Sequence, residues 1–289
     1  MKKIFSVPSV FGLMIMILSV GWPIFSQAQA ARRARLQQSF QGDPVAAVQP
    51  LEQAFNIEGV KRTALIYPNA NPAPESGAPL VFVFHGHGGT AKNAAKKFQI
   101  HLLWPEAVVV YMQGIPGVEG ITDPDGSKNG WQKDPGELND RDIKFFDAAL
   151  AGVEAGARID PNRVFVLGHS NGGRFANVLW HERGVEIAAV CSASGQGGAL
   201  IPECIPRSIM IVAGEEDPLV SYQSQTASVV LARRLLQTNP DKATKQGYVT
   251  LEPGATGLEL ATYLHPGGHE FPKPALKVAV EFFKRQHLN

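Results

Sequence analysis

The feature that most constrains the fold is a series of short, wholly apolar runs rich in β-branched residues. Such runs occupy residues 81–84, 107–112, 164–167, 187–191 and 209–212. Continuous apolar runs of this length are typical of strands buried on both faces, as in parallel sheets covered by helices. Helical patterns lie between several of the runs, so we expect an α/β fold: a mostly parallel central sheet with helices on both faces.

The remaining elements follow from periodicity. We expect helices over residues 91–103, 142–157, 171–183, 221–237 and 274–284. An antiparallel first strand is expected over residues 60–67, and later strands over 248–251 and 258–264. No repeat or domain linker interrupts this alternation, and 289 residues suit a signal segment plus one large domain.

Residues 115–138 fit no regular element, because they are dense in Gly, Pro and Asp. Loops of this length in a compact domain are usually functional or mobile. The loop contains Trp131, whose ring could form a substrate-binding wall or could instead anchor the loop to the core. We carry Trp131 as a candidate substrate-binding residue, and both interpretations stay open.

The sequence VFVLGHSNGG at residues 164–173 carries the chemistry. It places Gly168-x-Ser170-x-Gly172 directly after a buried strand and before a helix, which is the context of a nucleophile elbow. The glycines leave room for the sharp turn, and the hydroxyl stands at a helix N-terminus where negative charge is favoured. We therefore expect Ser170 to be a nucleophile.

A serine nucleophile needs a base that is itself oriented by an acid, and in this context the order along the chain is Ser, acid, His. Asp217 follows an apolar strand, with Glu215 and Glu216 as competitors for the acid. His269 follows the last strand, and His265 competes with it but falls nearer the strand. The backbone N–H groups of His87, in the Gly-rich turn after residues 81–84, and of Asn171 are the expected oxyanion donors.

Together these segments resemble the α/β-hydrolase superfamily, and within it the secreted esterases of the polyhydroxybutyrate depolymerase and feruloyl esterase group. The likeness covers residues 80–272 and depends on His85-Gly86, Asp142-Ile143-x-Phe145, Ile159-Asp160-Pro161-x-Arg163, Gly168-x-Ser170-x-Gly172-Gly173, Asp217-Pro218-Leu219-Val220 and Gly267-Gly268-His269. The resemblance implies a catalytic triad of Ser170, Asp217 and His269. It favours Asp217 over the two glutamates through the family's Asp-Pro-x-Val signature.

The chain departs from this family in three places. His87 stands where the family often has Cys, and Glu270-Phe271-Pro272 replaces a Thr-Trp-Pro sequence. No polymer-binding module follows the last expected helix. We therefore expect a serine carboxylic-ester hydrolase that acts through an acyl-enzyme on soluble feruloyl, acetyl or short hydroxyalkanoate esters, with no cofactor and no metal.

Residues 1–30 are expected to be a cleaved secretory signal peptide. They combine Lys2 and Lys3 with the apolar run 10–20 and an Ala-Gln-Ala cleavage pattern at 28–30. This leaves residues 31–289 as a single catalytic domain that is secreted or periplasmic, with no stable membrane anchor. Export favours a disulfide between Cys191 and Cys204, worth about 3 kcal/mol; two buried free thiols are the alternative.

Net charge excludes several partner classes. The chain carries +1, or −1 without Lys2 and Lys3, so no surplus attracts nucleic acid or an anionic membrane. We expect a monomer whose partner is its ester substrate. Two other functions remain open: a hydrolase-fold binding protein without catalysis, and a zinc hydrolase that uses His85-Gly86-His87.

Overall fold

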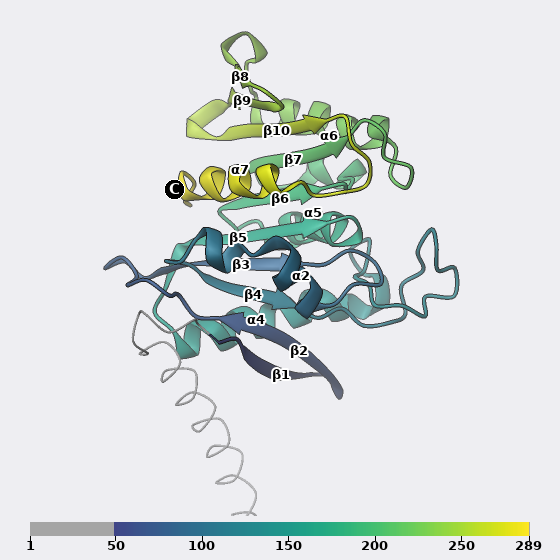
Figure 1. Cartoon of the computed structure of the whole chain (residues 1–289), viewed down its shortest axis with the longest axis vertical. Helices are drawn as coiled ribbons and strands as arrows, with labels where there is room; N and C mark the ends of the chain where they lie inside the picture. The colour runs from purple at the N-terminus through teal and green to yellow at the C-terminus, as the bar shows by residue number, and fades with distance from the viewer. Residues whose placement is uncertain (1–48, 289) are drawn as a thin grey trace, which may run out of the picture.

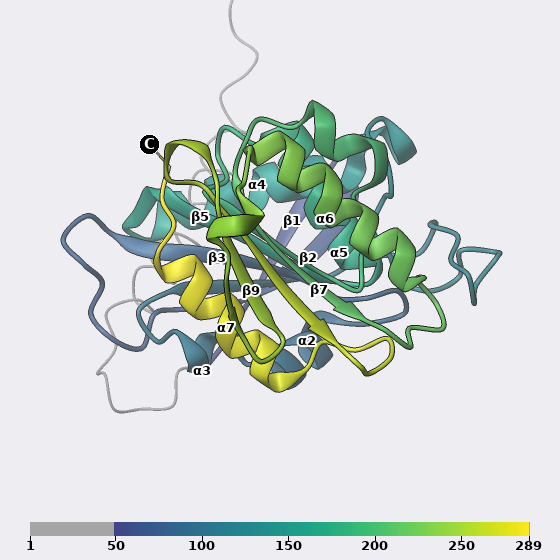
Figure 2. The same cartoon turned by 90° about the horizontal axis from the view of Figure 1, so that it is seen from above.

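The computed structural model describes residues 49–288. These residues form one mixed ten-stranded sheet in the order β1-β2-β4-β3-β5-β6-β7-β10-β9-β8, with helices on both faces (Figures 1 and 2). The expected signal peptide, residues 1–30, lies outside the described residues. Within residues 49–288, every helix is too short or too polar to cross a membrane.

The sheet is parallel at its centre and antiparallel at its edges. Strands β4, β3, β5, β6, β7 and β10 run parallel, while β1 and β2 close one edge and β9 and β8 the other. The strands are β1 Leu51–Ile57, β2 Val60–Tyr67, β3 Ala78–Phe84, β4 Val108–Met112, β5 Ile159–His169, β6 Ala189–Ala193, β7 Ser208–Gly214, β8 Thr244–Gln246, β9 Val249–Pro253 and β10 Glu259–His265.

In residues 49–288, helices cover both faces of the sheet (Figure 2). Helices α4, α5 and α6 pack on one face, and α2, α3 and α7 on the other. The helices are α2 Ala91–Phe98, α3 Ile100–Leu103, α4 Arg141–Gly156, α5 Asn171–Arg183, α6 Tyr222–Leu236 and α7 Lys273–Lys284. Short 3₁₀ turns lie at Glu137–Asp140, Gly198–Glu203, Pro240–Lys242 and Ala255–Gly257.

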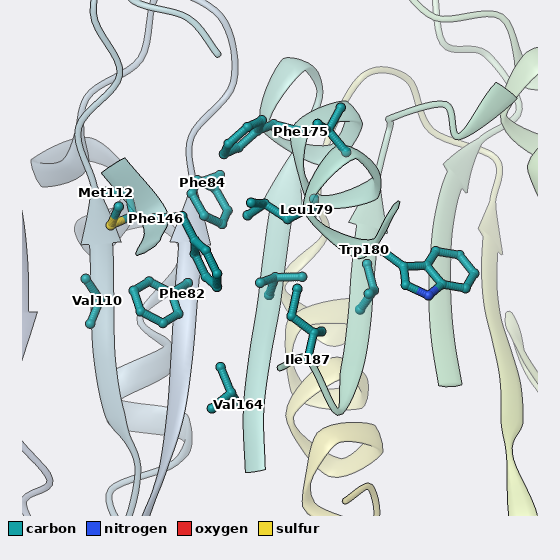
Figure 3. Close-up of a cluster of buried hydrophobic side chains, with 14 of the residues drawn as sticks. Phe82, Phe84, Val110, Met112, Phe146, Val164, Phe175, Leu179, Trp180 and Ile187 are labelled. Carbon is teal, nitrogen blue, oxygen red and sulfur yellow. The ribbon is translucent and has the colours of Figure 1, made fainter. Parts of the chain in front are cut away.

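Alternating side chains of the central strands supply two separate cores. In β3, Phe82 and Phe84 enter the core under α4 and α5, where they meet Phe146 and Phe175 edge-on (Figure 3). Val83 points to the opposite core, under α2 and α7. Full burial of a side chain of this size contributes about 1.5–3 kcal/mol, which explains why these strands are apolar on both faces.

The expected fold class is confirmed, with differences at particular elements. The helix expected over residues 91–103 breaks at Gln99, which has a φ of 51° and separates α2 from α3. Two strands were not expected. Strand β1 is half exposed and joins β2 through Glu58 and Gly59, both at positive φ, and β8 is wholly exposed, so neither has a buried strand's pattern.

The predicted disulfide is wrong, because Cys191 and Cys204 are free buried thiols. Cys191 lies in β6 with its side chain in the core under α7, whereas Cys204 packs in the core on the other face of the sheet. The Sγ of Cys204 donates instead to the carbonyl of Leu200, at 3.3 Å. Burial raises the pKa of Cys204 to about 12, which disfavours the reactive thiolate.

Candidate active site

Ser170 occupies a strained turn between β5 and α5. Its backbone has φ 59° and ψ −123°, a conformation that non-glycine residues rarely adopt. A Cβ on Gly168 would overlap the carbonyl oxygen of Gly172, and a Cβ on Gly172 would overlap that of Phe84. The turn therefore accepts only glycine on either side of the serine, which explains the local sequence.

Ser170, His269 and Asp217 form a continuous chain of hydrogen bonds. The Oγ of Ser170 lies 2.7 Å from Nε2 of His269. The Nδ1 of His269 lies 2.8 Å and 3.0 Å from the two carboxylate oxygens of Asp217. Asp217 follows β7 and His269 follows β10, and the parallel pairing of these strands brings their carboxyl ends together.

The carboxylate of Asp217 is held by several donors. Oδ1 accepts the backbone N–H groups of Leu219 (2.8 Å) and Val220 (2.9 Å), and Oδ2 accepts Nε2 of the buried Gln225 at 2.9 Å. Burial raises the pKa of Asp217, but the hydrogen bonds from Val220, His269 and Leu219 outweigh it, so the net pKa is lowered. The group is thus a carboxylate at neutral pH and accepts the Nδ1–H of His269.

The three competitors lie elsewhere. Glu215 and Glu216 have exposed side chains, and neither contacts His269. His265 is buried, and its Nδ1 accepts the backbone N–H of Gly267 at 3.1 Å. Desolvation lowers the pKa of His265, so it is a neutral structural residue beneath the His269 loop.

The two residues that carry the expected oxyanion donors lie at the same cavity as Ser170. His87 and Asn171 both line it, together with Ser170. Among residues 49–288, no acceptor is paired with the backbone N–H of His87 or of Asn171. Within these residues both N–H groups are thus without a hydrogen-bond partner, as an oxyanion donor requires.

The cavity has a volume of about 410 Å³ and a mixed lining. Its apolar lining residues are Ile121, Pro124, Leu219 and Val220, and its polar ones include Lys133 and Gln196. Arg174 also lines it, but its guanidinium is occupied by the carbonyls of Lys133, Gln196 and Gly197 and by Asp134. Apart from Leu219 and Val220, quoted in a family signature, the sequence did not single out these wall residues. For Ile121, Pro124 and Lys133 the signal was the long loop of residues 115–138.

The prediction that Trp131 binds substrate is wrong. Its side chain is 0% exposed, stacks on Phe175 (ring centroids 5.5 Å apart) and lies outside the residues that line the cavity. Its Nε1 donates to the carbonyl of His85 at 2.9 Å. Trp131 therefore anchors the loop to the core, which was the alternative interpretation.

The two histidines of the His85-Gly86-His87 segment point apart. The Nδ1 of His85 donates to the carbonyl of Gly86 (2.8 Å), and its Nε2 accepts the N–H of Gly114 (3.0 Å). Desolvation lowers the pKa of His85 to about 4, so the ring is neutral. His87 instead contacts Asp123. In residues 49–288, no group of three or more His, Cys, Asp or Glu side chains is placed to hold a metal ion.

No family model matches the chain, but individual proteins do. It is 28% identical over 186 residues to "Putative esterase NocK" of Nocardia uniformis, covering 61% of this chain and 51% of that protein. It is 35% identical over 105 residues to feruloyl esterase D of Neurospora crassa, covering 36% of this chain and 31% of that one. The chain thus aligns with about half of the first relative and about a third of the second.

Solved structures identify the fold. Acetyl xylan esterase from Aspergillus awamori superposes with a TM-score of 0.60 at 16% sequence identity, over 83% of this chain and the whole of that one. This likeness, with the strand order described above, confirms that the chain has the α/β-hydrolase fold.

Proposed function

We propose that this protein is a serine carboxylic-ester hydrolase. The observation that carries the proposal is the hydrogen-bonded chain from Asp217 through His269 to Ser170, at an elbow that opens onto a cavity. The names of the matched relatives, feruloyl esterase D among them, support the same class of reaction. Fold alone does not decide it, since one fold hosts many functions.

In the proposed reaction, Nε2 of His269 takes the proton of the Ser170 hydroxyl as Oγ attacks the ester carbonyl. Asp217 orients the imidazole and stabilises its protonated form. The backbone N–H groups of His87 and Asn171 donate to the oxyanion of the tetrahedral intermediate. His269 then protonates the departing alcohol, and water hydrolyses the acyl-enzyme by the same steps in reverse.

We propose soluble feruloyl, acetyl or short hydroxyalkanoate esters as substrates. The volume of the cavity suits a small ester, since ligand pockets span about 300–1,000 Å³. Its apolar lining residues, such as Leu219 and Val220, suit the hydrocarbon part of an acyl group. Export, with cleavage after Ala30 and residues 31–289 as one mature domain, belongs to the same proposal.

The test is hydrolysis of p-nitrophenyl acetate by the purified protein and by Ser170→Ala. We expect the variant to lose at least ~10³-fold in kcat with an unchanged circular dichroism spectrum, because it removes the nucleophile and little volume. Full activity in Ser170→Ala would refute the serine mechanism. Addition of a chelator tests the zinc-hydrolase alternative: that alternative predicts loss of activity, whereas a serine hydrolase should stay active. An inactive wild type would favour the binding-protein alternative.

A further inference from the structure

The two proposed oxyanion donors belong to residues whose side chains both hold one segment, residues 114–131, here called the bracing loop. The Nε2 of His87 lies 2.9 Å from Oδ2 of Asp123. At the second donor residue, Oδ1 of Asn171 accepts the backbone N–H of Trp131 (2.7 Å) and Nδ2 donates to the carbonyl of Trp131 (2.9 Å). The bracing loop therefore connects the two halves of the proposed oxyanion hole. On the right of Figure 1, part of it projects beyond the carboxyl ends of the parallel strands.

Asp123 is built into this loop as a charged acceptor. Its Oδ1 accepts the N–H and the hydroxyl of Ser127, at 3.1 and 2.7 Å, and its Oδ2 accepts the N–H of Lys128 at 2.8 Å. Hydrogen bonds, above all that of the Ser127 hydroxyl, hold the pKa of Asp123 far below its usual range. A carboxylate can only accept, so Nε2 of His87 donates the proton in the His87–Asp123 bond.

The ring of His87 lies in a slot between two glycines of the same loop. A Cβ on Gly120 would lie 2.8 Å from Nε2 of His87, and a Cβ on Gly130 would lie 3.0 Å from Nδ1. Neither glycine has a positive φ, so backbone conformation does not require glycine at these positions. A Cβ at Gly120 would collide with the imidazole, and one at Gly130 would press tightly against it, so a side chain at either position would displace the ring.

The residues after His87 are held by the same loop. The N–H of Gly88 donates to the carbonyl of Asn129 (2.7 Å), and Nδ2 of Asn129 donates to the carbonyl of Gly89 (3.0 Å). The peptide of His87 is thus fixed through its own ring and through the following residues, while its N–H stays unpaired among the described residues.

We propose that Asp123 is a positioning residue of the oxyanion hole, which acts through the imidazole of His87 to fix the backbone N–H of His87 relative to that of Asn171. The proposal rests on the proposed function. It makes one specific prediction: replacing Asp123 lowers kcat only when the His87 side chain is present. A residue that merely supports the loop would not show this dependence.

The experiment is a double-mutant cycle in the purified full-length protein, with kcat and KM measured on p-nitrophenyl acetate. Asp123→Ala and His87→Ala each remove one end of the bond, and His87→Ala keeps the backbone N–H. We expect each to lower kcat roughly 10- to 100-fold, with a much smaller change in KM, because misplacing an oxyanion donor weakens transition-state binding. The double variant should lose no more than either single one.

A matched control comes from the same connection between β4 and α4. Glu137 is also a carboxylate that accepts backbone N–H groups, those of Lys133 and Asp134, but it does not contact His87. Glu137→Ala should lower the thermal midpoint and leave kcat near that of the wild type. Equal kcat losses in Glu137→Ala and Asp123→Ala, or additive losses in the cycle, would overturn the proposal.

Asp123→Asn keeps the cycle informative if the alanine variant does not fold. Asn can still accept from Ser127, but its amide faces His87 and Lys128 with a donor, so kcat should fall here too. Wild-type kcat in a folded Asp123→Asn would also overturn the proposal. Ser170→Ala separates the two proposals: if it keeps wild-type kcat, the hydrolase proposal fails. If it is inactive while the Asp123 variants keep wild-type kcat, only the positioning role fails.

Discussion

The proposed triad and the bracing loop meet at one cavity, which Ser170 and loop residues such as Ile121 line, but they are positioned by different means. Ser170, Asp217 and His269 each follow a buried parallel strand, namely β5, β7 and β10. The bracing loop contains no strand, and it is held by hydrogen bonds and by the anchor of Trp131. The triad therefore inherits its geometry from the register of the sheet, whereas the loop depends on individual side chains.

Because of this difference, we expect substitutions in the two regions to affect turnover and stability differently. We expect a polar substitution in the proposed triad to change the reaction, because the sheet still holds the residue in place. A substitution in the loop's supports changes both the free energy of unfolding and the shape of the cavity. The following predictions test that separation.

The largest effect is expected from Asp217→Asn. The amide keeps the shape of the carboxylate but cannot accept the Nδ1–H of His269 in the same way, so kcat should fall about 10³- to 10⁴-fold. The circular dichroism spectrum should not change. Glu216→Gln is the control, since Glu216 is exposed and does not contact His269. A larger loss in Glu216→Gln would show that the acid is misassigned.

A smaller effect, on the pH dependence of stability, is expected from His85. This residue follows β3 and contacts Gly114 and Trp131 at the two ends of the bracing loop. Its pKa is about 4 in the folded protein, lowered mainly by desolvation, against about 6.5 in the unfolded chain. Between these values the unfolded state binds a proton that the folded state does not. The free energy of unfolding should therefore fall as pH falls from about 6.5 to about 4, by at most about 3 kcal/mol from this residue.

Urea unfolding at several pH values measures this dependence. His85→Gln can still accept the N–H of Gly114 but does not titrate, so its stability should vary less with pH over that window. A part of the slope should remain, because His169 also has a lowered pKa, of about 3. An unchanged slope in His85→Gln would contradict the assignment.

The smallest effect is expected from Trp131→Phe, which removes the Nε1–H bond to His85 and part of the buried ring. Stability should fall by about 2 kcal/mol in urea unfolding. Trp180→Phe is matched, because Trp180 is also fully buried and its Nε1 donates to the carbonyl of Ile205. Both should lose similar stability, but only Trp131→Phe should raise KM. Equal KM values would mean that the loop anchor does not shape the cavity.

Much of the sheet could be predicted because its central strands carry their own pattern. Continuous apolar runs such as those in β3 and β4 are typical of strands buried on both faces. The edge strands β1 and β8 have no such pattern, since solvent covers part of their surface. The break at Gln99 depends on one left-handed residue within a helical pattern, which periodicity does not detect.

The site residues also divide into those that the sequence predicts and those that it does not. Ser170, Asp217 and His269 were singled out because strand ends, glycines and chain order mark them, and the structure brings these three side chains together. The predictions for Trp131 and for the cysteines failed because the sequence does not show which core each side chain enters. Asp123 acquires its contact with His87 only when two loops distant in sequence meet. Spacing along the chain carries no signal for such contacts.

Positions around the site differ in how freely they can mutate, and the two glycines that flank Ser170, Gly168 and Gly172, are the most restricted. At 168 and 172 any side chain meets backbone, so selection on a mutant library would return glycine alone. Ile121 and Leu219, at 76% and 41% exposure on the cavity wall, meet no such limit. An evolving lineage of this protein could therefore change its substrate range at the rim while the nucleophile's turn stays frozen.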